Sequence, residues 1–256
     1  MNPTANKDTV LNVSGISKRF GGLQALTDVG MTIQRGQVYG LIGPNGAGKT
    51  TFFNVITGLY TPDSGTFELA GKPYQPTAVH EVAKAGIART FQNIRLFAEM
   101  TALENVAGKR HGGPPCAHPL RFAGGDFPHT QLQSRRGSHC PTCTRVARLR
   151  GHWQIRRDQR RLEIARALAT DPQLIALDEP AAGMNATEKV QLRELIDQIR
   201  KDNRTILLIE HDVKLVMGLC DRVTVLDYGK QIAEGTPADV QKNEKVIEAY
   251  LGTGGH

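Results

Sequence analysis

A glycine-rich loop, placed between an apolar strand and a helix, constrains the fold of this chain more than any other feature. Val38–Ile42 is a short apolar run that leads into the sequence Gly43-Pro44-Asn45-Gly46-Ala47-Gly48-Lys49-Thr50, and residues 50–57 have the pattern of a helix. In G-x-x-x-x-G-K-[ST] loops, glycines let backbone N–H groups curl around phosphate oxygens, and the following helix points its positive end at the same anion. The segment therefore predicts a nucleotide phosphate site in an α/β fold.

The charged and hydroxyl side chains of this loop indicate which ligands it binds. Lys49 is expected to reach the β- and γ-phosphates, and Thr50 is expected to ligate a Mg²⁺ ion. ATP and Mg²⁺ are thus the predicted ligands, and the rival interpretation is a chance glycine-rich turn. The residues expected to surround the nucleotide are Gly43, Pro44, Asn45, Gly46, Ala47, Gly48, Lys49, Thr50 and Thr51.

Two later apolar runs end in polar side chains suited to catalysis. Residues 174–177 lead into Asp178 and Glu179, and residues 205–209 lead into Glu210 and His211. Asp178 is expected to hold the Mg²⁺ shell, and Glu179 to polarise the attacking water as a general base. His211 is expected to contact the γ-phosphate. The alternatives are a solvated acidic turn and a structural histidine.

The remaining pattern predicts the fold class. Residues 10–20 and 25–33 alternate loosely between apolar and polar side chains, as antiparallel strands do. Downstream, apolar runs alternate with helical patterns, which predicts a parallel sheet with helices on its faces. We therefore expect an α/β fold: a P-loop NTPase core with a mainly parallel sheet, an N-terminal antiparallel β subdomain and an inserted helical lobe. Further strands are expected at 66–69, 174–177, 205–210 and 223–226, further helices at 159–169, 188–201 and 213–219, and turns at 64–65 and 70–71. In the helix at 188–201, Val190, Leu192, Leu195, Ile196 and Ile199 are expected to form the buried stripe.

Charge and hydropathy exclude two classes of function. The net charge is +7, but residues 107–157 hold nine Arg, one Lys and a single acidic residue, Asp126, so that this segment alone carries +9. The basic character is local and does not describe a nucleic-acid-binding face. The apolar runs are strand-length, far below the roughly 20 residues of a membrane span, and the N-terminus lacks the apolar region of a signal peptide. We expect a cytosolic chain that meets the membrane through a partner.

Further segments complete a pattern that resembles the ATP-binding subunits of ABC transporters. These are Arg89-Thr90-Phe91-Gln92, Asp158-Gln159-Arg160-Arg161 and Ala182-Gly183-Met184-Asn185, and the resemblance covers residues 9–106 and 158–253. It implies that Gln92 touches the Mg²⁺ ion or the water and couples hydrolysis to the membrane subunit. It also implies that Phe20 stacks on adenine, the alternative being a core position, and that residues 182–185 contact the opposite subunit.

Residues 88–97, 178–185 and 246–252 narrow the resemblance to the LivG-type ATPases of branched-chain amino acid import. This family implies a second ABC ATPase subunit, identical or paralogous, and two integral membrane permease subunits. A periplasmic solute-binding protein is implied indirectly, and no nucleic acid. The implied location is the cytoplasmic face of the membrane. The rival functions are a catalytically impaired nucleotide-binding subunit and an ABC ATPase outside transport.

One segment departs from the family. Residues 154–157 read Gln-Ile-Arg-Arg where the family carries a Leu-Ser-Gly-Gly-type signature that binds the γ-phosphate held by the partner. Residues 107–157 also lack the apolar periodicity of the expected helical lobe. We favour a shifted reading frame here. The alternatives are a basic linker and a metal-binding insert, whose possible ligands are Cys116, His129, His139, Cys140 and Cys143. The predicted organisation is one ATP-binding domain over 1–256, with its core at 1–92 and 158–256 and its lobe at about 93–157.

Overall fold

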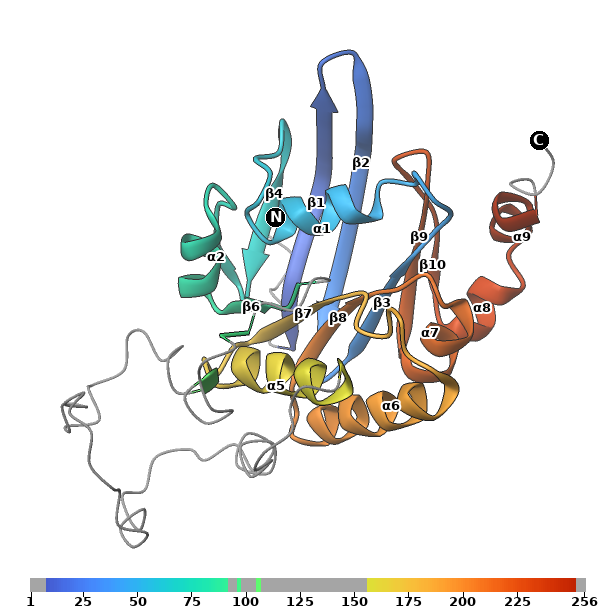
Figure 1. The fold of residues 1–256 in the computed structure, drawn as a ribbon. Coiled ribbons are helices and arrows are strands. Elements are labelled where there is room, and N and C mark those ends of the chain that lie inside the picture. Colours follow the sequence, from blue (N-terminus) through green and yellow to red (C-terminus); the bar gives the residue numbers. More distant parts are fainter. Residues whose placement is uncertain (1–7, 92–95, 98–104, 107–155, 252–256) are drawn as a thin grey trace, which may run out of the picture.

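The computed structural model describes residues 8–91, 96–97, 105–106 and 156–251, and Figure 1 shows how their helices and strands are arranged. The strands are β1 (Thr9–Phe20), β2 (Leu23–Gln34), β3 (Val38–Ile42), β4 (Ser64–Leu69), β5 (Lys72–Pro73), β6 (Ile87–Arg89), β7 (Leu174–Asp178), β8 (Thr205–Ile209), β9 (Arg222–Asp227) and β10 (Lys230–Gly235). The helices are α1 (Lys49–Ile56), α2 (Val79–Ala85), α5 (Arg156–Leu168), α6 (Ala186–Lys201), α7 (Val213–Leu219), α8 (Pro237–Gln241) and α9 (Glu244–Leu251). Within these ranges, no helix is both long and apolar enough to cross a bilayer.

A six-stranded sheet forms the centre of the fold. Its strand order is β10-β9-β3-β8-β7-β6, and every neighbouring pair is parallel except β10 with β9. The expected mainly parallel sheet is confirmed. Because parallel strands end at the same edge, the loops that follow β3, β7 and β8 all leave the sheet at one side. That edge is where ligands of open α/β sheets bind.

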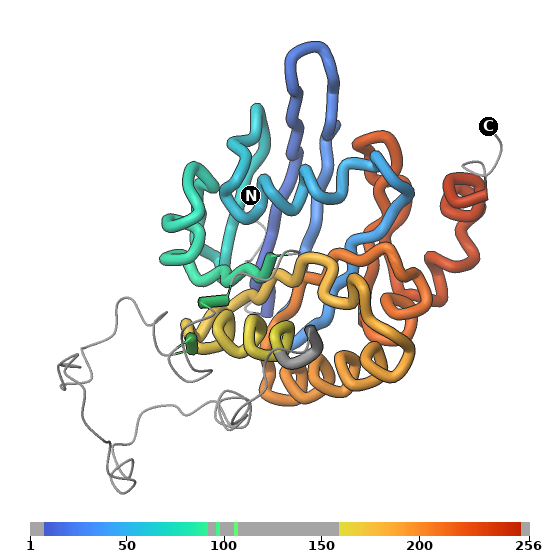
Figure 2. Tube along the Cα trace, viewed as in Figure 1, coloured from blue at the N-terminus to red at the C-terminus, as the bar shows by residue number. Residues whose placement is uncertain are grey.

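A second sheet is antiparallel and N-terminal, as expected. Its order is β2-β1-β4-β5, with β1 paired to both β2 and β4. The β1–β2 hairpin, blue in Figure 2, extends well beyond the rest of the fold at its tip. Residues Phe20 and Leu23 form the last pair at this tip, so the side chains there face solvent more than those near the sheet centre.

Alternating side chains of the parallel sheet build two separate cores. On β7, Leu174 and Ala176 pack in the cluster that contains Phe52 of α1 and the antiparallel sheet. Ile175 and Leu177 pack instead in the cluster of α5, α6 and α7. Figure 1 shows α1 on one side of the sheet and α5 and α6 on the other. Burial of apolar area on both faces, at about 25 cal/mol per Å², holds the central strands in place.

The structure differs from the sequence-based expectations at several positions. Val190 was expected on the buried stripe of α6, but it is 57% exposed. It precedes Leu192 by two residues, and side chains two residues apart point to nearly opposite sides of a helix. The other expected members of that stripe are buried: Leu192, Leu195, Ile196 and Ile199. The turn expected at 64–65 is wrong, since Ser64 is the first residue of β4 and pairs there with Ser17 of β1. Strands β5, β6 and β10 and helices α2, α8 and α9 were not anticipated.

Candidate active site

The glycine-rich loop runs from the end of β3 to the start of α1, as the motif predicts. Gly43 has a φ of 152°, and a Cβ atom there would lie 2.1 Å from the carbonyl oxygen of Leu226. Gly48 caps the N-terminus of α1 at a φ of 95°, and a Cβ atom there would lie 2.9 Å from the carbonyl oxygen of Ala25. Both positions therefore require glycine, because the loop is held against β2 and β9. The positive end of α1 faces the space that the loop encloses.

Lys49 is folded back over this loop. Its Nζ atom donates hydrogen bonds to the carbonyl oxygens of Gly43 at 2.7 Å and of Pro44 at 2.8 Å, and the residue is buried. Burial lowers the pKa of the ammonium group, while the nearby Glu179 carboxylate raises it. A cation held by two loop carbonyls can exchange them for phosphate oxygens. Thr50 and Thr51 follow on α1, where the Thr50 side chain is exposed.

Asp178 ends β7 and is buried. Its Oδ2 atom lies 2.7 Å from the Nη2 atom of Arg89, and its backbone N–H donates to the Thr90 hydroxyl at 3.3 Å. The resemblance to the family implies no role for Arg89, whose partner lies 89 positions away in the sequence. A contact over that separation leaves no local signal in the sequence.

Glu179 and His211 meet at the carboxyl ends of β7 and β8. The His211 Nδ1 atom lies 3.8 Å from the Oε2 atom of Glu179. Glu179 has a φ of 43°, an unusual backbone conformation for a glutamate, and its N–H donates to the carbonyl oxygen of Ile209 at 3.1 Å. The turn that follows Asp178 is thereby fixed against β8. The three expected residues Asp178, Glu179 and His211, together with Lys49, are brought to one edge of the sheet.

Glu210 is a further buried carboxyl at this edge, and its contacts were not anticipated. The residue is fully buried, and its Oε1 atom accepts a hydrogen bond from the Ala181 backbone N–H at 2.7 Å. Its Oε2 atom lies 3.8 Å from Nδ1 of His211. Burial raises the pKa of this carboxyl. A glutamate at the end of a fully apolar run was the signal available in the sequence.

Phe20 lies at the tip of the β1–β2 hairpin and not in the core. Its side chain is 41% exposed and packs edge-to-face on Tyr60, with ring centroids 5.2 Å apart. The Lys18 ammonium group lies 5.4 Å from the same ring. The core alternative for Phe20 is therefore wrong, and the stacking role stays a prediction.

Several expected site residues lie outside the described part of the chain. These are Gln92, residues 154 and 155 of the signature position, and the possible metal ligands Cys116, His129, His139, Cys140 and Cys143. Helix α5 begins at Arg156, three residues earlier than expected. The three interpretations of residues 107–157, and the assignment of the whole chain to one domain, stay predictions.

The donor set at this edge fits a Mg²⁺ ion bound together with phosphate. In the described ranges, no three His, Cys, Asp or Glu side chains gather as a protein-only metal site would require. Mg²⁺ instead prefers oxygen ligands and is usually held by one or two carboxylates, a hydroxyl and the phosphates of the substrate. Asp178 and the exposed hydroxyl-bearing Thr50 offer that chemistry.

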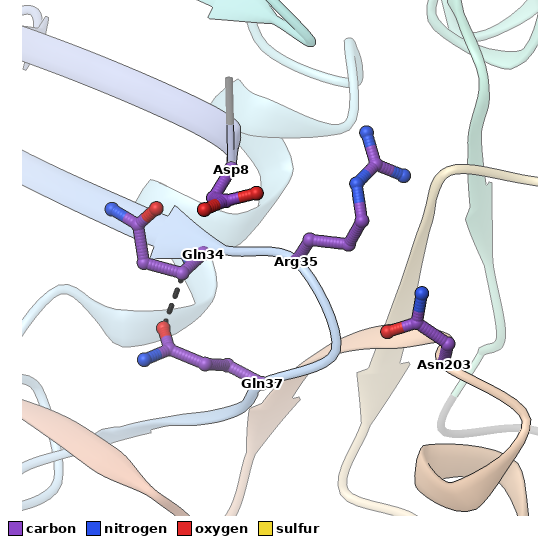
Figure 3. A pocket seen from close by; sticks show the side chains of 5 residues that line it. All are labelled: Asp8, Gln34, Arg35, Gln37 and Asn203. Carbon is purple, nitrogen blue, oxygen red and sulfur yellow. Dashed lines mark hydrogen bonds between the residues drawn. The ribbon is translucent and has the colours of Figure 1, made fainter. Parts of the chain in front are cut away.

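A pocket elsewhere on the surface has no part in this arrangement. It has a volume of about 540 Å³ and is lined by Asp8, Gln34, Arg35, Gln37 and Asn203. Figure 3 shows Asp8 just before β1, Gln34 at the end of β2, Arg35 and Gln37 before β3, and Asn203 before β8. Gln37 accepts a hydrogen bond from the Gln34 backbone N–H at 2.9 Å. The loops that precede β3 and β8 enter the parallel strands at their amino ends. The pocket thus lies at the edge of the sheet opposite to the glycine-rich loop.

Comparisons with known proteins agree with this geometry. Residues 26–182 match the family described as ABC transporter, and residues 230–256 match the family described as branched-chain amino acid ATP-binding cassette transporter. The chain is 43% identical over 255 residues to the high-affinity branched-chain amino acid transport ATP-binding protein BraF of Pseudomonas aeruginosa, covering 95% of this chain and 98% of BraF. It is 42% identical over 257 residues to the corresponding protein LivG of Escherichia coli K12, with the same coverage.

Solved structures show the same fold. An ATP-binding cassette of an ABC transporter, crystallised in its ADP conformation, superposes with a TM-score of 0.74 at 29% identity, covering 95% of this chain and 99% of that one. A nucleotide-free ATP-binding cassette superposes with a TM-score of 0.73 at 29% identity, covering 94% and 98%. The expected family and fold class are confirmed: this chain belongs to the ABC transporter family of ATP-binding cassettes.

Proposed function

We propose that this cassette binds ATP with Mg²⁺ and hydrolyses it to drive import of branched-chain or related amino acids. The observation that carries the proposal is the meeting of Lys49, Asp178, Glu179 and His211 beside a glycine-rich loop at one edge of the sheet. The 3.8 Å distance between His211 Nδ1 and Glu179 Oε2, and the electrostatic interaction of Glu179 with Lys49, support a shared role for these three side chains. The solute class is taken from the relatives BraF and LivG, which are named as branched-chain amino acid transport ATP-binding proteins.

The residues divide the work of hydrolysis between binding and proton transfer. Lys49 and the N–H groups at the start of α1 would bind the β- and γ-phosphates and neutralise charge on them. Glu179 would accept a proton from the attacking water, and His211 would donate a hydrogen bond to the γ-phosphate. Asp178, Thr50 and Gln92 would hold Mg²⁺, which supplies charge neutralisation at the phosphate oxygens when bound. Phe20 would stack on adenine.

The proposed assembly is that of an importer. A second ABC ATPase subunit would complete each nucleotide site. Two membrane permease subunits would bind the ATPase subunits and change conformation with them. A periplasmic solute-binding protein would deliver the solute. The cassette itself would lie at the cytoplasmic face of the membrane without spanning it. Closing on ATP and opening after hydrolysis is a two-state change that the permeases can follow.

A second candidate is a nucleotide-binding subunit that hydrolyses ATP poorly. The observation that favours it is the Gln154-Ile155-Arg156-Arg157 sequence at the signature position. Arginine side chains there would obstruct the close backbone approach to phosphate that glycine allows. This chain would then supply the P-loop half of one site without completing the opposite one.

The test is ATP turnover and leucine uptake after reconstitution with the permease subunits in vesicles. Three proteins are compared: the chain as it stands, the variant Gln154→Leu/Ile155→Ser/Arg156→Tyr/Arg157→Gly, and a chimera in which residues 107–157 come from BraF. The main proposal predicts ATP turnover with leucine uptake from all three proteins. The impaired-subunit candidate predicts little turnover from the first protein and restored turnover with leucine uptake from the chimera. Full turnover by the unaltered chain would refute the impaired-subunit candidate. A chimera that hydrolyses ATP without moving leucine would refute the amino acid assignment.

A further inference from the structure

The guanidinium group of Arg89 joins the phosphate-loop helix to the acidic strand end. Its Nη1 atom donates to Oδ1 of Asn54 and to Oγ1 of Thr57, both at 2.8 Å and both on or just after α1. Its Nη2 atom donates to Oδ2 of Asp178 at 2.7 Å. One side chain, itself at the end of β6, thus holds residues from α1 and β7 at fixed separation.

The partners of this group are buried, so its interactions are not weakened by solvent. The side chains of Arg89 and Asp178 are 9% and 10% exposed, and Thr57 and Asn54 are also buried. Charge-assisted hydrogen bonds in such surroundings are strong and directional. The planar fork of arginine can serve acceptors on two elements together, whereas a lysine ammonium group lacks that fixed geometry.

Two aromatic rings lie close to the guanidinium. The Cζ atom of Arg89 lies 4.5 Å from the centre of the Phe53 ring and 5.2 Å from that of Phe91. Such contacts favour the charged group at this position and limit its rotation. Phe91 directly precedes Gln92, so the same side chain also contacts the segment that leads to that residue.

We propose that Arg89 is a positioning residue for the metal-binding carboxylate of this site. Of the described side chains, Arg89 provides the hydrogen bond that orients the Asp178 carboxylate, and it uses Oδ2. Oδ1 is then the oxygen left for Mg²⁺ or its water. Because Arg89 also binds Asn54 and Thr57, it holds that oxygen at a fixed position relative to α1, whose first turn carries Thr50. The inference rests on the proposed function, since it presumes that Asp178 serves Mg²⁺.

The alternative role for Arg89 would be competition with the metal. A cation paired with Asp178 lowers the negative potential that attracts Mg²⁺, so its removal would then strengthen metal binding. If Arg89 orients the carboxylate, removing it should weaken Mg²⁺ binding, and if Arg89 competes with the metal, removing it should strengthen Mg²⁺ binding. The outer-shell partners of metal ligands commonly contribute a factor of about 10 to 100 in metal affinity, and the three-point anchoring of Arg89 favours the orienting role.

The test measures binding of a non-hydrolysable ATP analogue to the full chain, in excess Mg²⁺ and in EDTA. The ratio of the two dissociation constants is the metal-dependent gain. We expect Arg89→Met to lower this gain about tenfold, while the affinity in EDTA stays within about twofold. Arg89→Lys should lower the gain by less, because it keeps the charge without the fork. Thr57→Val removes one anchor and should lower the gain while leaving the pairing with Asp178 in place.

Arg204→Met is the matched control. Arg204 also pairs with an aspartate, Asp171 at 2.6 Å, but that aspartate is 68% exposed and lies at the loop between α5 and β7. The control should keep the full gain. An unchanged or larger gain in Arg89→Met would overturn the inference. If Arg89→Met does not fold, an unchanged gain in both Arg89→Lys and Thr57→Val overturns it instead. A wild-type protein that binds the analogue without any gain from Mg²⁺ would refute the metal part of the proposed function itself.

Discussion

Arg160 and Glu163 form a buried ion pair, with Nη1 and Oε2 2.7 Å apart and side chains only 4% and 6% exposed. The same two side chains bind the backbone of Phe91 from both directions. Nη1 of Arg160 donates to its carbonyl oxygen at 2.7 Å, and Oε1 of Glu163 accepts from its N–H at 2.9 Å. Helix α5, which begins within the signature position, is therefore tied to the residue that precedes Gln92.

Breaking this pair from one side should destabilise the protein strongly. Arg160→Met removes the guanidinium that hydrogen-bonds to the buried Glu163 carboxylate, and the charge of Arg166 still acts on that carboxylate. We expect the variant to lower the free energy of unfolding by about 3 kcal/mol. In the double variant Arg160→Met/Glu163→Gln the buried negative charge is gone and an acceptor for the Phe91 N–H stays. We therefore expect the double variant to recover more than half of the loss in urea unfolding at pH 7. A double variant no more stable than Arg160→Met would contradict this explanation.

The sequence predicted the local features of the fold well, because their causes are local. Strand β3 and helix α7 have the expected bounds of Val38–Ile42 and Val213–Leu219. The first is an unbroken apolar run that ends at the loop glycine, and the second follows Asp212, whose side chain accepts a hydrogen bond from the Leu215 N–H. Apolar periodicity and capping chemistry are both readable within a few residues.

The contacts that support the site could not be predicted in the same way. Arg89 finds Asp178 across 89 positions, and Glu210 binds the Ala181 backbone across 29. Such pairings depend on strand order, which the chain specifies only through its whole core. Strand β6 was missed for a related reason. It is three residues long and becomes a strand by pairing with β7.

Glu210 should make stability depend on pH. Its burial raises the pKa of the carboxyl above its ordinary value of 4.5. A carboxyl with a higher pKa in the folded state takes up a proton on folding, so its stabilising contribution is full below 4.5 and is lost as the pH rises through the folded-state pKa.

Glu210→Gln keeps an acceptor for the Ala181 N–H and removes this titration. We expect the unfolding free energy of the variant, relative to wild type, to rise as the pH increases above 4.5, as measured by urea unfolding at several pH values. A difference that does not change with pH would contradict the prediction.

Phe20 should contribute to the binding of the base but not of the phosphates. Removing the ring in Phe20→Ala is expected to weaken ATP binding by about 1–3 kcal/mol, whereas Phe20→Trp should keep most of the affinity. Inorganic tripolyphosphate has no base, and its affinity should be the same in all three proteins. Equal weakening of ATP and tripolyphosphate would show that Phe20 acts on the loop and not on adenine.

Glu179 should separate binding from chemistry. Glu179→Gln keeps the size and polarity of the side chain but cannot accept the proton of the attacking water. In the chimera with the BraF segment at 107–157, we expect this change to lower ATP turnover by about 100-fold or more, while the dissociation constant for ATP changes little. Asp212→Asn is the control. It is also an acid-to-amide change, just after β8, and should leave turnover within a few-fold. Turnover that survives Glu179→Gln would exclude Glu179 as the general base.

Equilibrium binding of ATP to the purified chain, measured by calorimetry with and without Mg²⁺, tests the central claim most directly. The loop that ends in Lys49 should bind the nucleotide more tightly with the metal present. Lys49→Ala, which removes the charged donor, should weaken binding by about 10- to 100-fold. A chain that binds no adenine nucleotide, or that binds it equally well after Lys49→Ala, would contradict the assignment of this loop as the phosphate site.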